Sequence, residues 1–496
     1  MRSAPVVGLV LLALAGPARA QDLPPVGREA VEALTFPPLD WSPPEPTVRE
    51  VHGVGVLHLE DRTLPLVSVF ARARGGFGHY AREWYAAGTA LPSLVRNGGS
   101  RSMPPDSVDA FLESFAVQTS FGGSGGNVFA TLNTLTEHLD TALAVWGDLL
   151  EHPRFDSSRV EVWRGNEMET VRRRKDDPQR LAFGEFNRLM YGDHPIGWEM
   201  EARDLTPDRL SPERLSWLHA RVFCRDNLVL GVVGDVSWEE VRPRIESLLA
   251  DWPACPEPLP EPPEPDIRTG GGVFLIPRDV SQSTIVMAHA SDIHMSDDPD
   301  YFASRIGNAI LGGAGFQSRL MERVRTESGY AYSAASLWTA PRENRGLVGV
   351  VTRTRSDRTV AATRLLLDVV DEMTEEPPRD AEVETVVSDI VNGFVFNFES
   401  PAQIVSRRMV YEGEDLPADW LERFVDGISA VTPRDVYRVF RREVRPGDMT
   451  ILVVGDPDGF DQDLSTLGPV TVLDPDRPST GGVSPAPPSA APRSRR

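Results

Sequence analysis

Two stretches that end in the same four residues decide how this chain is organised: NLVLGVVGD at residues 227–235 and DMTILVVGD at residues 448–456. Each is an apolar run with the length of a buried strand, and each follows a helical pattern and a turn that contains arginine. Each also closes a stretch of about 200 residues, which is an ordinary domain size. A duplicated unit explains this agreement better than a chance similarity between two apolar strands.

The elements around these stretches repeat a mixture of strands and helices, which predicts an α+β fold in both halves. Asp106 follows two prolines and is expected to cap its helix, and the glycine-rich residues 121–127 are expected to form a connection before an edge strand. Further strands are expected at residues 54–59, 64–73, 128–134, 273–276, 283–290 and 346–354. Helices are expected at residues 85–95, 106–115, 137–151, 160–175, 178–190, 211–220, 300–311, 358–375, 381–398 and 432–444.

Composition sets the class of protein. Of the 496 residues, 41% are hydrophobic and 25% are charged, which is typical of a globular protein. The formal net charge of -22 argues against a nucleic-acid partner, because the phosphate backbone demands a basic surface. No segment after the N-terminus approaches the roughly 18 apolar residues that a membrane-spanning helix needs.

The first 20 residues have the features of a signal peptide. Arg2 supplies the positive charge, residues 6–14 are apolar, and Ala18-Arg19-Ala20 forms a small-x-small cleavage site before Gln21. The apolar run is too short to span a membrane. We therefore expect the mature protein to be exported to the periplasm or the extracellular space.

Proline and glycine content predicts the domain boundaries. Residues 21–47 form a Pro-rich arm, and PACPEPLPEPPEPDIRTGGG at residues 253–272 is an exposed linker. This places one domain at residues 48–252 and a second at residues 273–467. The remaining residues, 468–496, have too few apolar side chains to join a core and are expected to be disordered.

Cysteine is rare, with Cys224 and Cys255 as the two positions. A single bridge is possible in an exported chain. Cys224, however, lies in the apolar sequence Val222-Phe223-Cys224, where a free cysteine often serves as a small buried hydrophobe. On this basis we do not expect the bridge.

The candidate functional residues lie in LGGAGFQSRLMERVRTESGYAYSAASLW, residues 311–338. A glycine-rich turn leads into a short helical pattern, and a strand pattern follows Gly329. Arg325 near the helix end and Tyr332 in the strand are seven residues apart and could reach one surface. A guanidinium and a phenol together can bind a peptide carbonyl or carboxylate. The alternative is an arginine in a surface ion pair beside a half-buried tyrosine.

With these motifs the chain resembles the M16 peptidase family, the pitrilysin-like inverted zinc peptidases and their non-catalytic partners. The resemblance runs from about residue 51 to residue 456 and rests on Ser318-Arg319-Leu320, Val324-Arg325 and GYAYS at residues 329–333, with YGDHPIG at residues 191–197 and KDDP at residues 175–178. It implies two duplicated α/β sandwich domains of the LuxS/M16 type, each an antiparallel-rich sheet packed by helices. It also implies that Arg325 and Tyr332 contact the bound peptide.

The chain departs from the family at the metal site. Active members carry H-x-x-E-H on the first long helix, where two histidines bind zinc and the glutamate is the general base. The matching positions hold Leu91, Leu94 and Val95, and the third ligand position falls at Thr170, beside Glu169. The other histidines lack the spacing of a two-histidine site on a helix. We therefore expect no catalytic residue and no metal ligand in this chain.

Two hypotheses follow from this pattern. In the first, the chain is the non-catalytic subunit of an exported heterodimer, in which a zinc-bearing M16 partner hydrolyses peptides or unfolded polypeptides that Arg325 and Tyr332 help to bind. In the second, it is a structural or peptide-binding protein of M16 fold that acts without a catalytic partner. An active peptidase with an unconventional metal site would need ligands that the sequence does not show.

Overall fold

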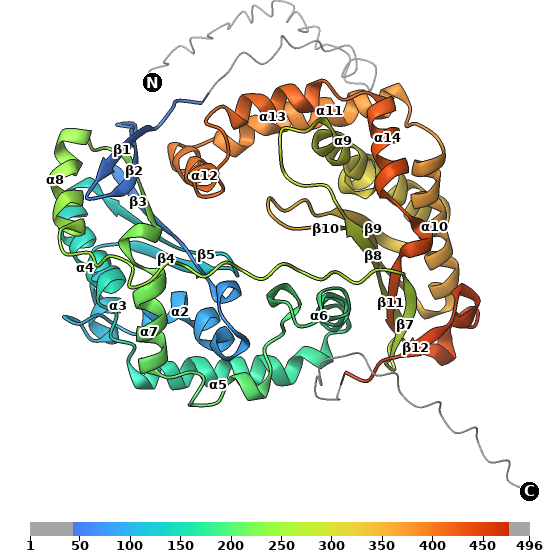
Figure 1. Cartoon of the computed structure of the whole chain (residues 1–496), viewed down its shortest axis with the longest axis horizontal. Helices are drawn as coiled ribbons and strands as arrows, with labels where there is room; N and C mark the ends of the chain where they lie inside the picture. The colour runs from blue at the N-terminus through green and yellow to red at the C-terminus, as the bar shows by residue number, and fades with distance from the viewer. Residues whose placement is uncertain (1–42, 476–496) are drawn as a thin grey trace, which may run out of the picture. The chain divides into compact units, whose positions relative to one another are not determined.

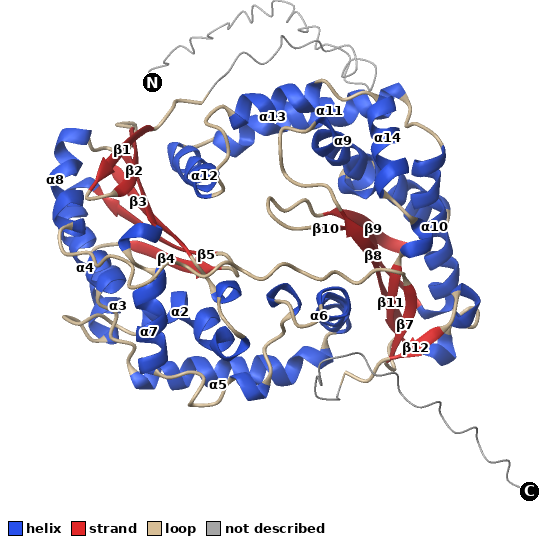
Figure 2. Cartoon of the chain, viewed as in Figure 1, coloured by secondary structure: helices blue, strands red, loops and turns tan. Residues whose placement is uncertain are grey.

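The computed structural model describes residues 43–475. The expected signal peptide, most of the Pro-rich arm and the end of the expected tail lie outside these residues. The described chain forms two six-stranded sheets with many helices (Figure 1), which confirms the predicted α+β class. Figure 2 shows each sheet with helices along one side. Between residues 43 and 475, no helix combines the length and the apolar character needed to cross a membrane.

The first sheet has the strand order β1-β2-β6-β3-β5-β4. Most of the helices in this half of the chain share one hydrophobic core with one face of the sheet. The strands are β1 (Thr47–Val51), β2 (Val54–Glu60), β3 (Leu66–Arg74), β4 (Gln118–Gly123), β5 (Asn127–Leu135) and β6 (Leu228–Gly234). The helices are α2 (Tyr85–Asn97), α3 (Pro105–Ser114), α4 (Leu139–Glu151), α5 (Ser157–Arg173), α6 (Pro178–Tyr191), α7 (Pro212–Val222) and α8 (Trp238–Leu249).

The second sheet has the strand order β12-β7-β11-β8-β10-β9 and a core of its own. Its strands are β7 (Gly272–Pro277), β8 (Gln282–Ser291), β9 (Ala331–Trp338), β10 (Gly346–Arg355), β11 (Thr450–Gly455) and β12 (Val470–Val472). Its helices are α9 (Pro299–Asn308), α10 (Thr359–Glu375), α11 (Asp380–Phe394), α12 (Pro401–Gly413), α13 (Trp420–Ser429) and α14 (Pro433–Glu443).

The two Val-Val-Gly-Asp stretches take the same place in their sheets. β6 pairs parallel with β2 and antiparallel with β3. β11 likewise pairs parallel with β7 and antiparallel with β8. Both are third in the strand order and almost entirely buried, as expected for an apolar run without polar alternation. The topology therefore confirms the duplication that the sequence predicts.

The second face of each sheet packs against a helix from the other half of the chain. Apolar residues of α6, including Phe186 and Met190, join a cluster with the second sheet. Val405 and Met409 of α12 join a smaller cluster with the first sheet. Gly231 of β6 lies under α12, where a Cβ atom would come within 2.5 Å of the Met409 sulfur. Helix and strand backbone approach closely here because this residue has no side chain.

Several elements differ from the sequence-based prediction. β1, α8, α12 and α13 were not predicted, and β12 lies in the stretch expected to be disordered, where it pairs parallel with β7. The edge strand is β4 rather than β5, because part of the glycine-rich stretch is itself a strand. The predicted cap at Asp106 is wrong: Pro104 is the N-cap and Asp106 lies in the first turn. Pro105 fits this earlier start because its fixed φ suits the first turn of a helix.

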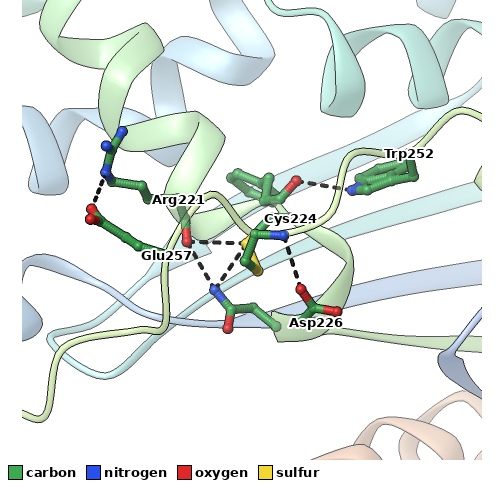
Figure 3. The surroundings of a disulfide bond; sticks show 8 residues. Arg221, Cys224, Asp226, Trp252 and Glu257 are labelled. Atoms are coloured by element: carbon green, nitrogen blue, oxygen red, sulfur yellow. Dashed lines mark hydrogen bonds and ion pairs between the residues drawn. A yellow bond between two sulfur atoms is a disulfide. The ribbon is translucent and has the colours of Figure 1, made fainter.

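The expectation of unbridged cysteines is wrong: Cys224 and Cys255, 31 residues apart, form a disulfide with a Cα–Cα distance of 4.8 Å. Contacts around the bridge bring the end of α7 and the start of the linker together (Figure 3). The Trp252 indole donates to the Phe223 carbonyl at 2.9 Å, and the Cys255 amide donates to Asp226 Oδ2 at 2.9 Å. Cys224 is fully buried, as expected. Helix α8 lies between the two cysteines in the sequence and brings the chain back, so that Cys255 reaches Cys224.

Candidate functional site

The three positions predicted to match the zinc ligands and the base of active M16 peptidases are part of the core. Leu91, Leu94 and Val95 lie on α2 and are 1%, 1% and 0% exposed. They belong to the large cluster that joins the helices to the first sheet. Their side chains are hydrocarbon and have no atom that could bind zinc or accept a proton. The residues of α2 therefore do not fit a zinc ion.

The third ligand position also lacks a metal-binding group. Thr170 lies on α5, and its hydroxyl donates to the Asn166 carbonyl at 3.1 Å. The neighbouring Glu169 forms an ion pair with Arg173 at 2.5 Å. Thr170 lines a cavity of about 590 Å³. In the part of the chain that the structure describes, no group of three or more His, Cys, Asp or Glu residues could hold a metal.

The segment that carries Arg325 and Tyr332 has irregular helical geometry. After α9 the chain forms a π-helical turn at Ala309–Gly313, a 3-10 turn at Gly315–Gln317 and a second π-helical turn at Met321–Glu327. The short helix predicted here therefore exists, but as a wider helix. π-helical turns are rare and occur frequently at functional sites. Gly312 makes the arrangement possible, because a Cβ atom there would lie 2.3 Å from the Ser336 nitrogen.

Arg325 differs from the two arginines that precede it. Arg319 donates to both oxygens of Glu382, at 2.9 and 3.0 Å. Arg323 contacts Glu372 at 2.8 Å. Arg325 has no ion pair with any residue of the described chain, and its Nη1 atom is buried without a hydrogen-bond partner. Arg325 is therefore not held by an acidic side chain of the described residues, while its two neighbours use their donors in ion pairs.

Two aromatic rings hold the Arg325 guanidinium instead. Its Cζ atom lies 4.6 Å from the ring centroid of Tyr332 and 4.6 Å from that of Phe316. Such contacts attract a cation to the face of a ring. Both rings face solvent: Tyr332 is 79% exposed and Phe316 71%. The structure thus brings Arg325 and Tyr332 together, and shows neither the ion pair nor the half-buried tyrosine of the alternative interpretation.

Tyr332 lies on a β-bulge at the sheet edge. Ala331 pairs with Thr354 and Ala334 with Thr352, so Tyr332 and Ser333 face the single residue Arg353. The Thr354 hydroxyl donates to the Tyr330 carbonyl at 2.7 Å, and the Thr352 hydroxyl donates to the Ser333 carbonyl at 2.7 Å. Bulges redirect side chains and are over-represented next to active sites. The two threonines therefore fix the backbone on both sides of Tyr332.

Sequence reasoning missed three residues of this site: Phe316, Thr352 and Thr354. A large aromatic directly after a glycine in a turn is a weak signal that could have marked Phe316. The threonines gave no signal, since their side chains continue an ordinary strand pattern. The role of Arg325 and Tyr332 in binding a substrate stays a prediction.

Comparisons with known proteins show which family the chain resembles. Residues 209–389 match the family model described as Peptidase M16 inactive domain. A zinc protease of Streptomyces coelicolor is 26% identical over 329 residues, which cover 65% of this chain and 70% of the relative. The non-peptidase homolog YmxG of Helicobacter pylori is 20% identical over 406 residues, which cover 81% of this chain and 92% of the relative.

Solved structures confirm the fold. A peptidase M16 inactive domain from Pseudomonas fluorescens superposes with a TM-score of 0.74 at 23% identity, over 83% of this chain and 98% of that one. The periplasmic protease PqqL from Escherichia coli superposes with a TM-score of 0.71 at 13% identity, over 86% of this chain and 49% of that one. The chain is therefore similar to M16 peptidase homologues of the inactive type, and it has hydrocarbon side chains at Leu91, Leu94 and Val95.

Proposed function

We propose that this chain is the non-catalytic subunit of an exported two-chain M16 peptidase, and that it binds peptide through Arg325 and Tyr332 for a zinc-bearing partner subunit. One observation carries the proposal: Arg325 has no carboxylate partner in the described chain and sits beside the exposed Tyr332. A purely structural arginine is normally paired, as Arg319 and Arg323 are here.

Division of the site between two chains is chemically reasonable. Peptide hydrolysis by a zinc peptidase needs a metal-bound water, a general base and donors for the carbonyl oxygen of the peptide. These donors stabilise the charge that develops on the oxygen, and they can belong to another chain. A guanidinium offers a fork of N–H groups and a phenol offers one O–H group. Arg325 and Tyr332 would supply this part, and the partner would supply zinc and the base.

The edge of the first sheet could hold the rest of the peptide. Within residues 43–475, β4 pairs with β5 and with no further strand. A strand at a sheet edge leaves backbone N–H and C=O groups free, and an extended peptide can add to them. The edge strand ends in Gly122 and Gly123, of which Gly123 is exposed. Main-chain pairing of this kind would bind peptides with little dependence on sequence.

Three observations support export. The Cys224–Cys255 disulfide is of a kind that persists in oxidising compartments outside the cytosol. Residues 1–20 have the sequence features of a signal peptide, although they lie outside the described residues. The Escherichia coli protein of similar fold is described as periplasmic.

The test is to assay the purified chain, alone and mixed with an M16 chain that carries H-x-x-E-H and is encoded beside it, on an internally quenched peptide. We expect hydrolysis by the mixture and none by this chain alone. Arg325→Ala should lower the rate of the mixture at least tenfold, since a hydrogen bond to a charged donor contributes about 1.5–3 kcal/mol. Arg364→Ala, an exposed arginine on α10, is the matched control and should leave the rate unchanged.

Two results would contradict the proposal. Hydrolysis by the isolated chain that survives Arg325→Ala would place the catalytic residues elsewhere. Peptide binding by a homodimer that never associates with the zinc-bearing chain, measured by size-exclusion chromatography and fluorescence anisotropy, would favour the second function, a peptide-binding protein without a catalytic partner.

A further inference from the structure

Phe316 is a large apolar side chain in an unusual place. It follows Gly315 in the 3-10 turn Gly315–Gln317 and is 71% exposed. Exposed single phenylalanines are common on protein surfaces and need no explanation by themselves. The ring of Phe316, however, lies 4.6 Å from Cζ of the one arginine in this segment that has no acidic partner among the described residues. This contact links Phe316 to the proposed peptide site.

The turn that carries Phe316 is held in place. Gly315 has a φ of 59°, which favours glycine, and no atom lies within 4 Å of where its Cβ would be. The buried Ser318 donates to the Gly315 carbonyl with both its amide, at 3.1 Å, and its hydroxyl, at 2.7 Å. Phe316 therefore lies on a turn whose backbone is held by hydrogen bonds.

We propose that Phe316 is a specificity-determining residue, which contacts a large apolar side chain of the peptide next to the main-chain oxygen that Arg325 binds. This inference rests on the proposed function and names its substrate class: peptides with a large apolar residue at one position. Its basis is that a free guanidinium and an exposed aromatic face lie in direct contact, so one ligand residue can reach both.

The chemistry of the neighbouring groups favours this ligand over an acidic side chain. A ligand carboxylate could pair with Arg325 by charge alone and would gain nothing from Phe316. A main-chain oxygen leaves its own side chain free to cover the ring, and removing that apolar surface from water is favourable. The exposed ring of Tyr332 offers a second apolar surface beside the same guanidinium.

The test uses the full chain and three fluorescein-labelled nonapeptides of glycine and serine that carry leucine, serine or glutamate at the central position. Fluorescence anisotropy should show the leucine peptide binding about tenfold more tightly than the serine peptide, the factor expected for burying roughly half of a leucine side chain. Phe316→Ala should bring this ratio close to one. Phe316→Leu should keep most of it, because an apolar surface remains. Phe396→Ala, which removes another phenylalanine that is 64% exposed, should leave the ratio unchanged.

The outcomes separate the two proposals. If Arg325→Ala weakens the binding of all three peptides while Phe316→Ala leaves the leucine-to-serine ratio intact, the role of Phe316 is wrong and the proposed function stands. Tightest binding of the glutamate peptide would also overturn the role of Phe316. If Arg325→Ala binds every peptide as the wild type does, the proposed function itself fails. Thermal unfolding of each variant confirms that the compared proteins are folded.

Discussion

Helix α2 and the segment at residues 311–338 are the two regions predicted to match parts of the M16 active site, and they differ in how far their side chains are exposed. On α2, Leu91, Leu94 and Val95 are within 1% of complete burial and join the main core. In the other segment, Tyr332 and Phe316 are more than two-thirds exposed. The side chains at the predicted metal positions pack in the core, whereas the two rings beside Arg325 face solvent.

The segment at residues 311–338 has features that cost free energy of folding. A buried N–H group without a partner costs about 1–3 kcal/mol, and the Nη1 atom of Arg325 is such a group. The segment also contains two π-helical turns and a β-bulge, which are irregular and are often found at functional sites. The contrast therefore supports ligand binding at Arg325 and a purely structural role for α2.

The largest effect on stability should come from placing a carboxylate at the predicted base position on α2. Leu94→Glu places a carboxylate at a position that is 1% exposed and has hydrocarbon neighbours. An unpaired buried charge should lower the free energy of unfolding by about 4 kcal/mol. Urea unfolding followed by tryptophan fluorescence measures this loss. Leu94→Met, which keeps volume and polarity, is the control and should cost less than about 1.5 kcal/mol.

The stability of Leu94→Glu should also depend on pH. Burial raises the pKa of a carboxyl group, so the buried glutamate is more easily tolerated when protonated. The deficit of Leu94→Glu should therefore shrink as the pH falls and grow as it rises. A variant as stable as the wild type would show that α2 can hydrate this position, which would remove the contrast between the two regions.

A second test removes the disulfide that supports the same core. The bridge closes a loop of 31 residues, so Cys224→Ala with Cys255→Ala should lower the free energy of unfolding by about 3 kcal/mol. α7, which ends beside Cys224, packs against α2 in the main core, whereas Arg325 belongs to the other half. Peptide affinity of the folded double variant should therefore equal that of the wild type. Lost affinity would mean that the two regions are coupled.

The missed disulfide shows where sequence reasoning stops. β6 and β11 could be predicted because an uninterrupted apolar run, flanked by turns, is a local signal of a buried strand. The pairing of Cys224 with Cys255 depends on α8, which brings the chain back across 31 residues and was itself not predicted. α12 was missed for a related reason. Its Val405 and Met409 pack on the sheet of the other half of the chain. The sequence around α12 does not show which surface it packs against.

The candidate site could likewise be predicted only in part. Arg325 and Tyr332 followed from the family resemblance and from a helix that leads into a strand. Their contact with Phe316 did not, because it depends on the geometry of a glycine turn and a π-helical turn. The bulge at Tyr332 and the threonines that hold it arise from strand register, which a single strand pattern does not determine.

A third test compares two arginines of one segment. Arg319→Ala leaves the largely buried Glu382 with Arg379 as its remaining basic partner, and should lower the free energy of unfolding by about 2 kcal/mol. Arg325→Ala removes no ion pair of the described chain. Loss of its two ring contacts and removal of its unpaired buried N–H group have opposite effects, so stability should change by less than about 1 kcal/mol. The substitution should instead weaken peptide binding at least tenfold. Equal effects on stability would mean that Arg325 is structural.

The ion pair of Glu382 also predicts a pH dependence. Burial by itself would raise the pKa of Glu382, but hydrogen bonds from Arg319 and Arg379 outweigh it and hold the pKa at about 2, below its ordinary 4.5. A lowered pKa stabilises the fold above the ordinary value, and this contribution is lost as the pH falls through the folded value. Wild-type stability should therefore decline between about pH 4.5 and pH 2. Arg319→Ala should show a shallower decline over the same range.

The smallest expected effect concerns the bulge that presents Tyr332. Thr354→Val keeps the shape of a side chain that is 1% exposed but removes its hydrogen bond to the Tyr330 carbonyl, which should cost about 1 kcal/mol. Thr284→Val on β8 is a close control, because the Thr284 hydroxyl is buried without a partner and its removal should be neutral or stabilising. If the bulge positions Tyr332, Thr354→Val should also weaken peptide binding severalfold while Thr284→Val does not. Stability loss without a change in peptide affinity would restrict Thr354 to a structural role and leave Arg325 and Phe316 as the ligand contacts of this segment.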